Sequence, residues 1–121
     1  MAYTTINKSS DFFNTKLYTG NAGTQAITGV GFQPDLVWTK ARNTTSSNLW
    51  YDIVRGVHKY IRSDKTNAEG TATNTLISFD SDGFTVGDGD NGNASGANGV
   101  AFNWKAGGGQ GSSNTDGSIN T

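Results

Sequence analysis

The sequence predicts an all-β domain, an antiparallel β-sandwich or jelly roll, and three observations lead to this fold class. Apolar and polar residues alternate with a period of two in several short segments. Nearly half of the 121 residues are Gly, Thr, Asn or Ser, and these supply turns between the segments. The best helical window, residues 48–62, is rich in β-branched and aromatic residues and contains Gly56. We therefore expect under about a tenth of the residues to be helical.

The first part of the chain is expected to form five short strands: residues 15–19, 25–28, 36–40, 48–53 and 58–62. Pro34 favours an extended backbone just before the third of these segments. The polar residues 42–47 join the third strand to the fourth.

The second part of the chain is expected to contain a β-hairpin and a final strand. Residues 75–79 and 84–86 alternate in hydrophobicity, and the Asp82-Gly83 pair between them is a strong turn signal. In the last segment, Val100, Phe102 and Trp104 alternate with small or polar residues. The total is about eight strands, as in a sandwich or jelly roll.

The large aromatic residues are the richest apolar resource of this chain, which has 3 Trp, 4 Tyr and 6 Phe. If the apolar side of each strand faces inward, the core contains Trp38, Phe79, Phe84, Phe102 and Trp104. On this assignment, replacing Trp104 with Ala would cost about 3–5 kcal/mol.

Other aromatic residues are candidates for contacts with a glycan or another protein: Trp50, Tyr51 and Tyr60. Trp50 and Tyr51 are adjacent and must point to opposite faces of a strand. Because Trp50 shares its face with Asp52, it is the first choice for a surface aromatic residue.

The domain is expected to span residues 1–106, with a flexible glycine-rich loop at 87–99, and residues 107–121 are expected to be a flexible tail or linker. Both glycine-rich segments carry few apolar groups to offset the entropy lost on ordering, so we expect neighbouring chains to order them. The letters of residues 87–92 match a dinucleotide-binding loop, but no helix follows to hold a pyrophosphate. The core is thin and lacks disulfides, which favours a homo-oligomer.

The chain offers little for catalysis or metal binding, because it has no cysteine, one histidine and one glutamate. Asp35 and Asp52 are expected to pair with Lys40, Arg42 or Arg55 rather than to form a catalytic pair, so we expect no enzymatic activity. We expect no cofactor. Ca²⁺ is the one alternative, because acidic residues gather in two loops as Asp80, Asp82, Asp88 and Asp90. The interpretation of these residues as turn formers is favoured.

The charge pattern argues against several classes of partner. The net charge is −1, so no strong field favours nucleic acid. No run of 18 apolar residues predicts a membrane span, so no membrane insertion is expected. The first residues show no basic segment followed by an apolar one, so no secretory signal is expected.

Five ordered motifs are spread along most of the chain: GFQPDLVWTK at 31–40, YDIVRG at 51–56, SFDSDGFTVG at 78–87, VAFNWKAGG at 100–108 and TDGSI at 115–119. On these motifs the chain resembles a domain of unknown function that recurs in virion and tail-appendage proteins of marine bacteriophages of the cyanophage and pelagiphage type. The resemblance implies a sandwich like the concanavalin A-like lectins and glucanases. It also implies a location in the virion after assembly in the cytoplasm of a bacterial host, and it supplies no catalytic residues.

Our leading functional hypothesis is a viral structural protein, as part of a tail fibre or appendage or as a capsid decoration. Its partners would be other virion proteins and further copies of the chain, with a host surface glycan as a further partner. The alternative is a lectin-like carbohydrate-binding module that uses exposed aromatic residues. A small glycan hydrolase is the least favoured hypothesis, because no pair of carboxylates stands out.

Overall fold

The computed structural model describes residues 7–106, and most of the regular structure in this range is β, as predicted. The helical elements are a 3₁₀ turn, η1 (Ser9–Asp11), and a short helix, α1 (Asp90–Asn93). The strands are β1 (Phe13–Thr19), β2 (Gln25–Ile27), β3 (Leu36–Ala41), β4 (Leu49–Asp52), β5 (Lys59–Arg62), β6 (Gly70–Thr71), β7 (Leu76–Asp80), β8 (Gly83–Val86) and β9 (Asn98–Trp104).

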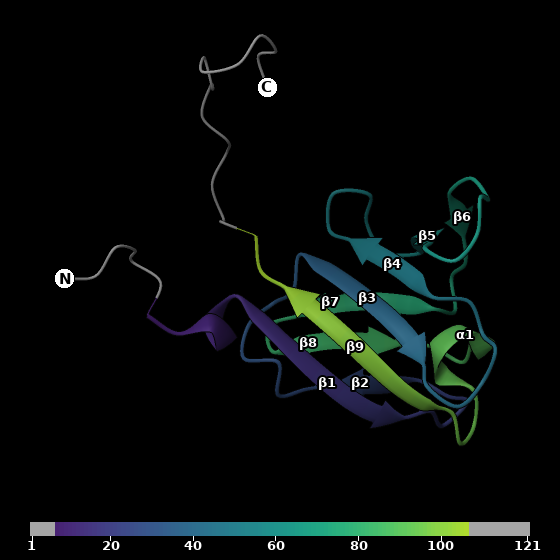
Figure 1. Cartoon of the computed structure of the whole chain (residues 1–121), viewed down its shortest axis with the longest axis horizontal. Coiled ribbons are helices and arrows are strands. Elements are labelled where there is room, and N and C mark those ends of the chain that lie inside the picture. Colours follow the sequence, from purple (N-terminus) through teal and green to yellow (C-terminus); the bar gives the residue numbers. More distant parts are fainter. Residues whose placement is uncertain (1–6, 107–121) are drawn as a thin grey trace, which may run out of the picture.

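The strands form two antiparallel sheets that lie one behind the other (Figure 1). The larger sheet has six strands in the order β1-β9-β3-β4-β5-β6, and the smaller has three in the order β2-β8-β7. The last strand, β9, lies between β1 and β3, so the two ends of the described chain meet within one sheet. The strands expected at residues 36–40 and 48–53 correspond to β3 and β4, which pair with each other.

The predicted hairpin is confirmed in β7 and β8, where Phe79 pairs with Phe84 and Asp80 pairs with Gly83. Gly83 has a φ of +155°, and a Cβ atom there would lie 1.9 Å from the carbonyl oxygen of Ile27. The hairpin can therefore lie close to β2 only because this position has no side chain.

The core lies between the two sheets. Both contribute buried side chains to one cluster: Tyr18, Val37, Leu49, Tyr51, Tyr60 and Ala101 from the larger, and Ile27, Leu76, Phe84 and Val86 from the smaller. The prediction that Phe84 belongs to the core is confirmed, and Phe79 packs against the cluster while half-buried.

Three predicted core residues, Trp38, Phe102 and Trp104, lie instead on the outer face of the larger sheet, where they are half-buried. The alternate positions of β9 point inward, and these carry Ala101 and Asn103. The prediction was wrong because alternation separates two faces of a strand without showing which one a second sheet covers. Here, small residues of β9 leave room for the tyrosines of the core, and the largest rings face outward.

The glycine-rich segment at residues 87–99, which was expected to be a flexible loop, contains α1 and the start of β9. Asn93 is buried, and its side-chain amide donates hydrogen bonds to the carbonyl oxygens of Gly23 (2.5 Å) and Gly87 (2.6 Å). The backbone amide of Asn21 donates to the Asn93 side-chain oxygen at 3.2 Å. Contacts within the chain therefore hold this segment. The expected tail at residues 107–121 lies outside the described residues.

Candidate functional site

Five aromatic residues gather on the outer face of the larger sheet, and we call them the aromatic cluster: Phe13, Trp38, Trp50, Phe102 and Trp104. Strand register brings them together, because Trp38 lies directly opposite Trp50 on β4 and Phe102 on β9. Phe13 on the first strand lies opposite Trp104. Side chains opposite each other in neighbouring strands are close enough for ring contact.

The rings of the cluster stack on one another rather than lie flat on the sheet. Trp50 stacks on Trp38 with centroids 5.3 Å apart and on Trp104 with centroids 5.7 Å apart. The planes of these pairs differ by only 10° and 20°. Trp38 also stacks on Phe102, and Phe13 contacts Trp104, with ring centroids 5.2 Å apart in both pairs. Each ring of the cluster therefore contacts at least one other ring. Neighbouring rings therefore cover the faces that a sugar would need for stacking.

The surface around the aromatic cluster is also apolar. Leu17 is 61% exposed on β1, and Ile61 is 41% exposed on β5. Ile61 lies opposite Trp50 in the register of β4 and β5. The indole nitrogen of Trp38 donates to the hydroxyl of Ser63 at 3.1 Å, which fixes one ring of the cluster in place. The larger sheet thus presents an ordered apolar face to solvent.

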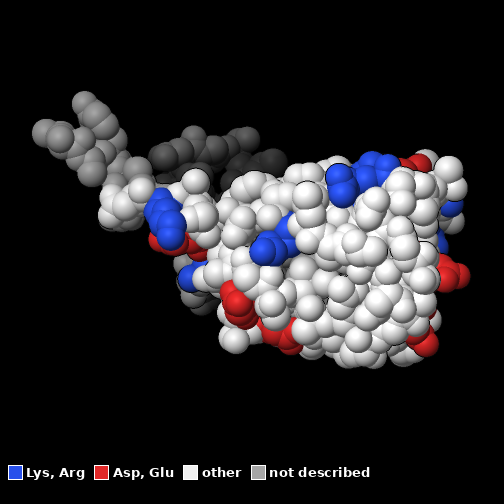
Figure 2. Space-filling view, turned by 90° about the horizontal axis from the view of Figure 1, so that it is seen from below, with Lys and Arg blue, Asp and Glu red and all other residues white. Residues whose placement is uncertain are grey.

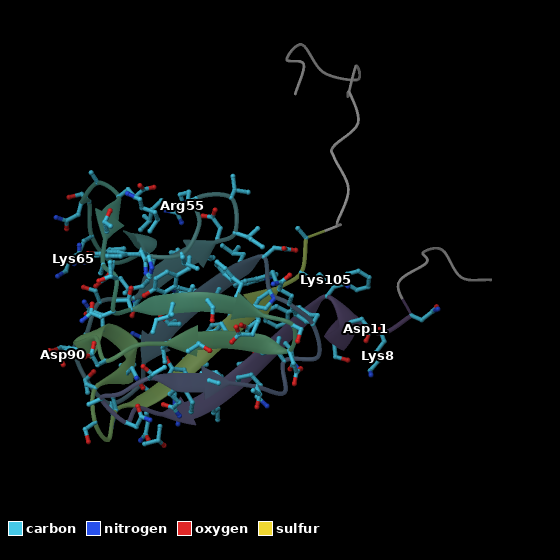
Figure 3. The ribbon with its side chains drawn as sticks, turned by 180° about the vertical axis from the view of Figure 1, so that it is seen from behind. Lys8, Asp11, Arg55, Lys65, Asp90 and Lys105 are labelled. Atoms are coloured by element: carbon cyan, nitrogen blue, oxygen red, sulfur yellow. The ribbon has the colours of Figure 1, made fainter. Side chains whose placement is uncertain are left out.

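A groove of about 620 Å³ adjoins one end of the aromatic cluster. It is lined by Asp35, Leu36, Asp52, Ile53, Val54, Trp104, Lys105 and Ala106. Figure 3 labels Lys105, just after the end of β9, and Arg55, just after the end of β4. The groove therefore combines one indole with two carboxylates and a lysine.

Both carboxylates of the groove already have partners. A carboxylate oxygen of Asp35 accepts a hydrogen bond from the backbone amide of Ala106 at 2.7 Å. The Asp52 carboxylate accepts from the backbone amide of Arg55 at 2.8 Å and forms an ion pair with its guanidinium, as expected from the sequence. Burial raises the pKa of Asp52, but the hydrogen bonds and charge of Arg55 outweigh it, and the pKa lies below its ordinary value. A glycosidase acid needs a raised pKa, so Asp52 does not suit that role.

The three aromatic residues proposed as surface contacts lie on different faces of the larger sheet. Trp50 lies half-buried on the outer face, as expected, and belongs to the aromatic cluster. Tyr51 is 2% exposed and Tyr60 is 9% exposed, and both belong to the core, so their assignment to the surface was wrong. Desolvation raises the pKa of Tyr51 above its ordinary value, as expected for a phenol in the core. Phe13 was not singled out from the sequence, because it precedes the residues 15–19 that were expected to form the first strand.

Two of the four acidic residues considered for Ca²⁺, Asp80 and Asp82, serve as hydrogen-bond acceptors within the chain. The two oxygens of Asp80 accept from the hydroxyls of Ser78 and Thr85, each at 2.7 Å. Those of Asp82 accept from the backbone amides of Gly29 and Gly31. Asp88 and Asp90 are exposed. Among residues 7–106, no three His, Asp or Glu side chains come together in a way that could hold a metal ion. Within the same range, no helix is long and apolar enough to cross a membrane.

Comparison with known proteins shows the family. The chain belongs to the family described as a domain of unknown function, DUF7483, whose model matches residues 8–121. No curated protein matches the chain. No solved structure matches it either.

Proposed function

We propose that this domain is a non-enzymatic attachment module of a bacteriophage virion, in a tail fibre, a tail appendage or a capsid decoration. Its sequence motifs support the virion location through the resemblance to phage appendage proteins. Two of these motifs, residues 31–40 and 100–108, cover most of β3 and β9, the strands that carry three of the five rings of the aromatic cluster. We also propose that the two sheets form a sandwich of the jelly-roll or concanavalin A-like type.

The observation that carries the proposal is the aromatic cluster itself. A stacked set of rings on a solvent-facing sheet offers rigid apolar area at little entropy cost, as in protein–protein contacts. Burial of this area is worth about 25 cal/mol per Å² before the costs of association. The partner is therefore expected to be another virion protein with an apolar surface of its own.

A second candidate function is carbohydrate binding, and the groove favours it. The groove places the Trp104 ring beside two carboxylates, and sugar sites combine apolar ring contact with a few polar acceptors. This function ranks second because Asp35 and Asp52 already accept hydrogen bonds, and because neighbouring rings cover the faces of Trp50.

Two sets of variants separate these functions. Trp50→Ala and Phe13→Ser alter the aromatic cluster away from the groove, whereas Asp35→Asn and Val54→Ser alter the groove away from the cluster. Each variant is measured for incorporation into particles in an infected host and for binding to a glycan array, after circular dichroism confirms its fold.

Attachment through the cluster predicts loss of incorporation for the first pair and normal incorporation for the second pair. If the first pair is incorporated normally, the attachment proposal fails. If the groove variants also lose binding to a glycan that the unmodified chain binds, carbohydrate binding replaces it.

A further inference from the structure

The outer flank of β1 is an unpaired sheet edge. β1 has seven residues and pairs only with β9 among the described strands. In Figure 1 it lies at the lower side of the larger sheet. Figure 2 views the molecule from that side, and the surface there is mostly uncharged, with a few separate basic and acidic side chains. This flank is therefore open to a further strand.

The pairing with β9 shows which backbone groups of β1 face the open flank. The amide of Lys105 donates to the carbonyl oxygen of Phe12, and the amide of Gly20 donates to that of Ala97, both at 2.8 Å. Even-numbered residues therefore bond to β9, and the odd-numbered residues of β1 direct their N–H and C=O groups outward. One of these outward amides, that of Thr15, is bonded to the Asn14 side-chain oxygen at 2.9 Å.

The edge lacks most of the features that usually block strand addition. Natural edge strands are protected by proline, by bulges, by short length or by charged side chains, including inward-pointing ones, and of these β1 has only an inward-pointing lysine. β1 contains no proline, and its register with β9 is continuous over all seven residues. On its outer face are Phe13, which is 39% exposed, and Leu17, which is 61% exposed. Its one charged residue, Lys16, lies on the opposite face and is half-buried.

We propose that β1 pairs with β1 of a second copy of this chain, antiparallel and related by a two-fold axis at Thr15. In this register Thr15 lies opposite its own copy, and Phe13 of each chain lies opposite Leu17 of the other. These are hydrogen-bonded positions, so the two Phe13–Leu17 pairs form about four inter-chain backbone hydrogen bonds. Two more form at Thr15 when its amide exchanges the Asn14 side-chain oxygen for the carbonyl oxygen of the second copy. Two six-stranded sheets then join into one, and the exposed apolar residues of each edge cover those of the other.

Charge and strand length favour this register over two alternatives. A two-fold axis at Lys16 would place Lys16 directly opposite Lys16 in a non-hydrogen-bonded pair, where side chains are closest and like charges repel. An axis at Leu17 would carry Phe13 beyond the end of the partner strand. The axis at Thr15 instead places Lys16 opposite Asn14 and matches both exposed apolar residues.

The test uses the whole chain and two measurements. Light scattering at increasing concentration is expected to show a dimer for the unmodified chain. Leu17→Lys is expected to raise the dimer dissociation constant at least about tenfold, because it removes an apolar contact and adds charge on both sides of the axis. Ile61→Lys is the matched control, since Ile61 is exposed on the same sheet but far from β1 in the strand order. Circular dichroism and thermal melting check that both variants fold.

A single cysteine then tests the register, because the natural chain has none. With Thr15→Cys the two Cα atoms lie about 5.5 Å apart, within the range of a disulfide, so oxidation is expected to link two chains. With Thr19→Cys the two sites lie about 25 Å apart, and no such link is expected.

A stable monomer at high concentration overturns the proposal, and so does a dimer that Leu17→Lys leaves unchanged. If removal of residues 107–121 converts a monomer into a dimer, the chain's own segment occupies the edge, which also overturns it. Phe13 belongs both to the aromatic cluster and to this edge, so Trp50→Ala, which lies away from β1, distinguishes the two functions: it is expected to impair attachment and to leave the dimer unchanged.

Discussion

The indole rings of Trp38 and Trp50 stack 5.3 Å apart with 10° between their planes, directly opposite each other on β3 and β4. On the inner face of the same two strands, Val37 lies opposite Tyr51. One register therefore aligns two pairs with different roles, because the inner pair is buried in the core and the outer pair faces solvent. Slippage of the strands by one residue would exchange these roles.

Substitution of the neighbours Trp50 and Tyr51 is expected to have unequal effects on stability. Tyr51→Ala leaves a cavity in the core and is expected to cost about 3–5 kcal/mol. Trp50→Ala removes a half-buried ring with two stacked partners and is expected to cost about 1–3 kcal/mol. Urea unfolding of both variants measures these costs. Equal losses would contradict the assignment of Trp50 to the outer face.

Asn93→Ala is expected to loosen the glycine-rich segment at residues 87–99. The substitution leaves the carbonyl oxygens of Gly23 and Gly87 without their donor, at a cost of about 1–3 kcal/mol. Limited proteolysis is expected to cut this segment faster than in the unmodified chain. Ser95→Ala, at an exposed position of the same segment, is the control and should change neither property. Unchanged cleavage of Asn93→Ala would show that other contacts order the segment.

Gly83→Ala is expected to be more damaging than Gly31→Ala, although both glycines have positive φ. A Cβ atom at Gly83 would lie 1.9 Å from the Ile27 carbonyl oxygen, so backbone must move, at a cost above about 2 kcal/mol. At Gly31 no atom lies within 4 Å of the added carbon, which leaves only the backbone strain of about 1–2 kcal/mol. Thermal melting compares the two, and a similar loss for both would place β2 farther from the hairpin.

The strands could be predicted from the sequence because their signals are local. The Asp82-Gly83 turn and the alternation on each side of it fix the β7–β8 hairpin without any other part of the chain. In the same way, Pro34 and the polar residues 42–47 separate β3 from its neighbours. Short-range patterns of this kind depend on the backbone preferences of a few residues.

The candidate site could not be predicted in full, because the sequence does not show which side of a strand the second sheet covers. Val100, Phe102 and Trp104 form the more apolar side of β9, yet the side with Ala101 and Asn103 faces the core. Asn103 is accommodated there because its amide donates to the backbone carbonyl oxygens of Asn14 and Ala101. The hydrogen bond to Asn14, 89 residues away along the chain, leaves no pattern in the sequence.

Asp82→Asn is expected to reduce stability at neutral pH and to weaken its dependence on acid. The amides of Gly31 (2.7 Å) and Gly29 (2.9 Å) donate to the two oxygens of the Asp82 carboxylate. These bonds, Gly31 first, lower the pKa of Asp82 below its ordinary value of 3.8, with burial opposing and Lys16 assisting. Because the pKa of Asp82 is lower in the folded chain, the unfolded chain binds the proton more readily. The contribution of Asp82 to the free energy of unfolding is therefore fully present above about pH 4. It is lost as the pH falls through the folded pKa.

The measurement is the free energy of unfolding by urea from pH 7 to pH 2, for the unmodified chain and the variant. Asn has one acceptor oxygen and no charge, so it cannot serve both amides as a carboxylate does. The stability difference between the two chains is therefore expected to be largest above pH 4 and to shrink in acid. Asp52, whose pKa is also lowered, titrates in the same direction in both chains and cancels from this difference. Asp88→Asn removes the same charge at an exposed site and is the control. A difference that stays constant down to pH 2 would show that the Asp82 carboxylate does not hold residues 29–31 through its charge.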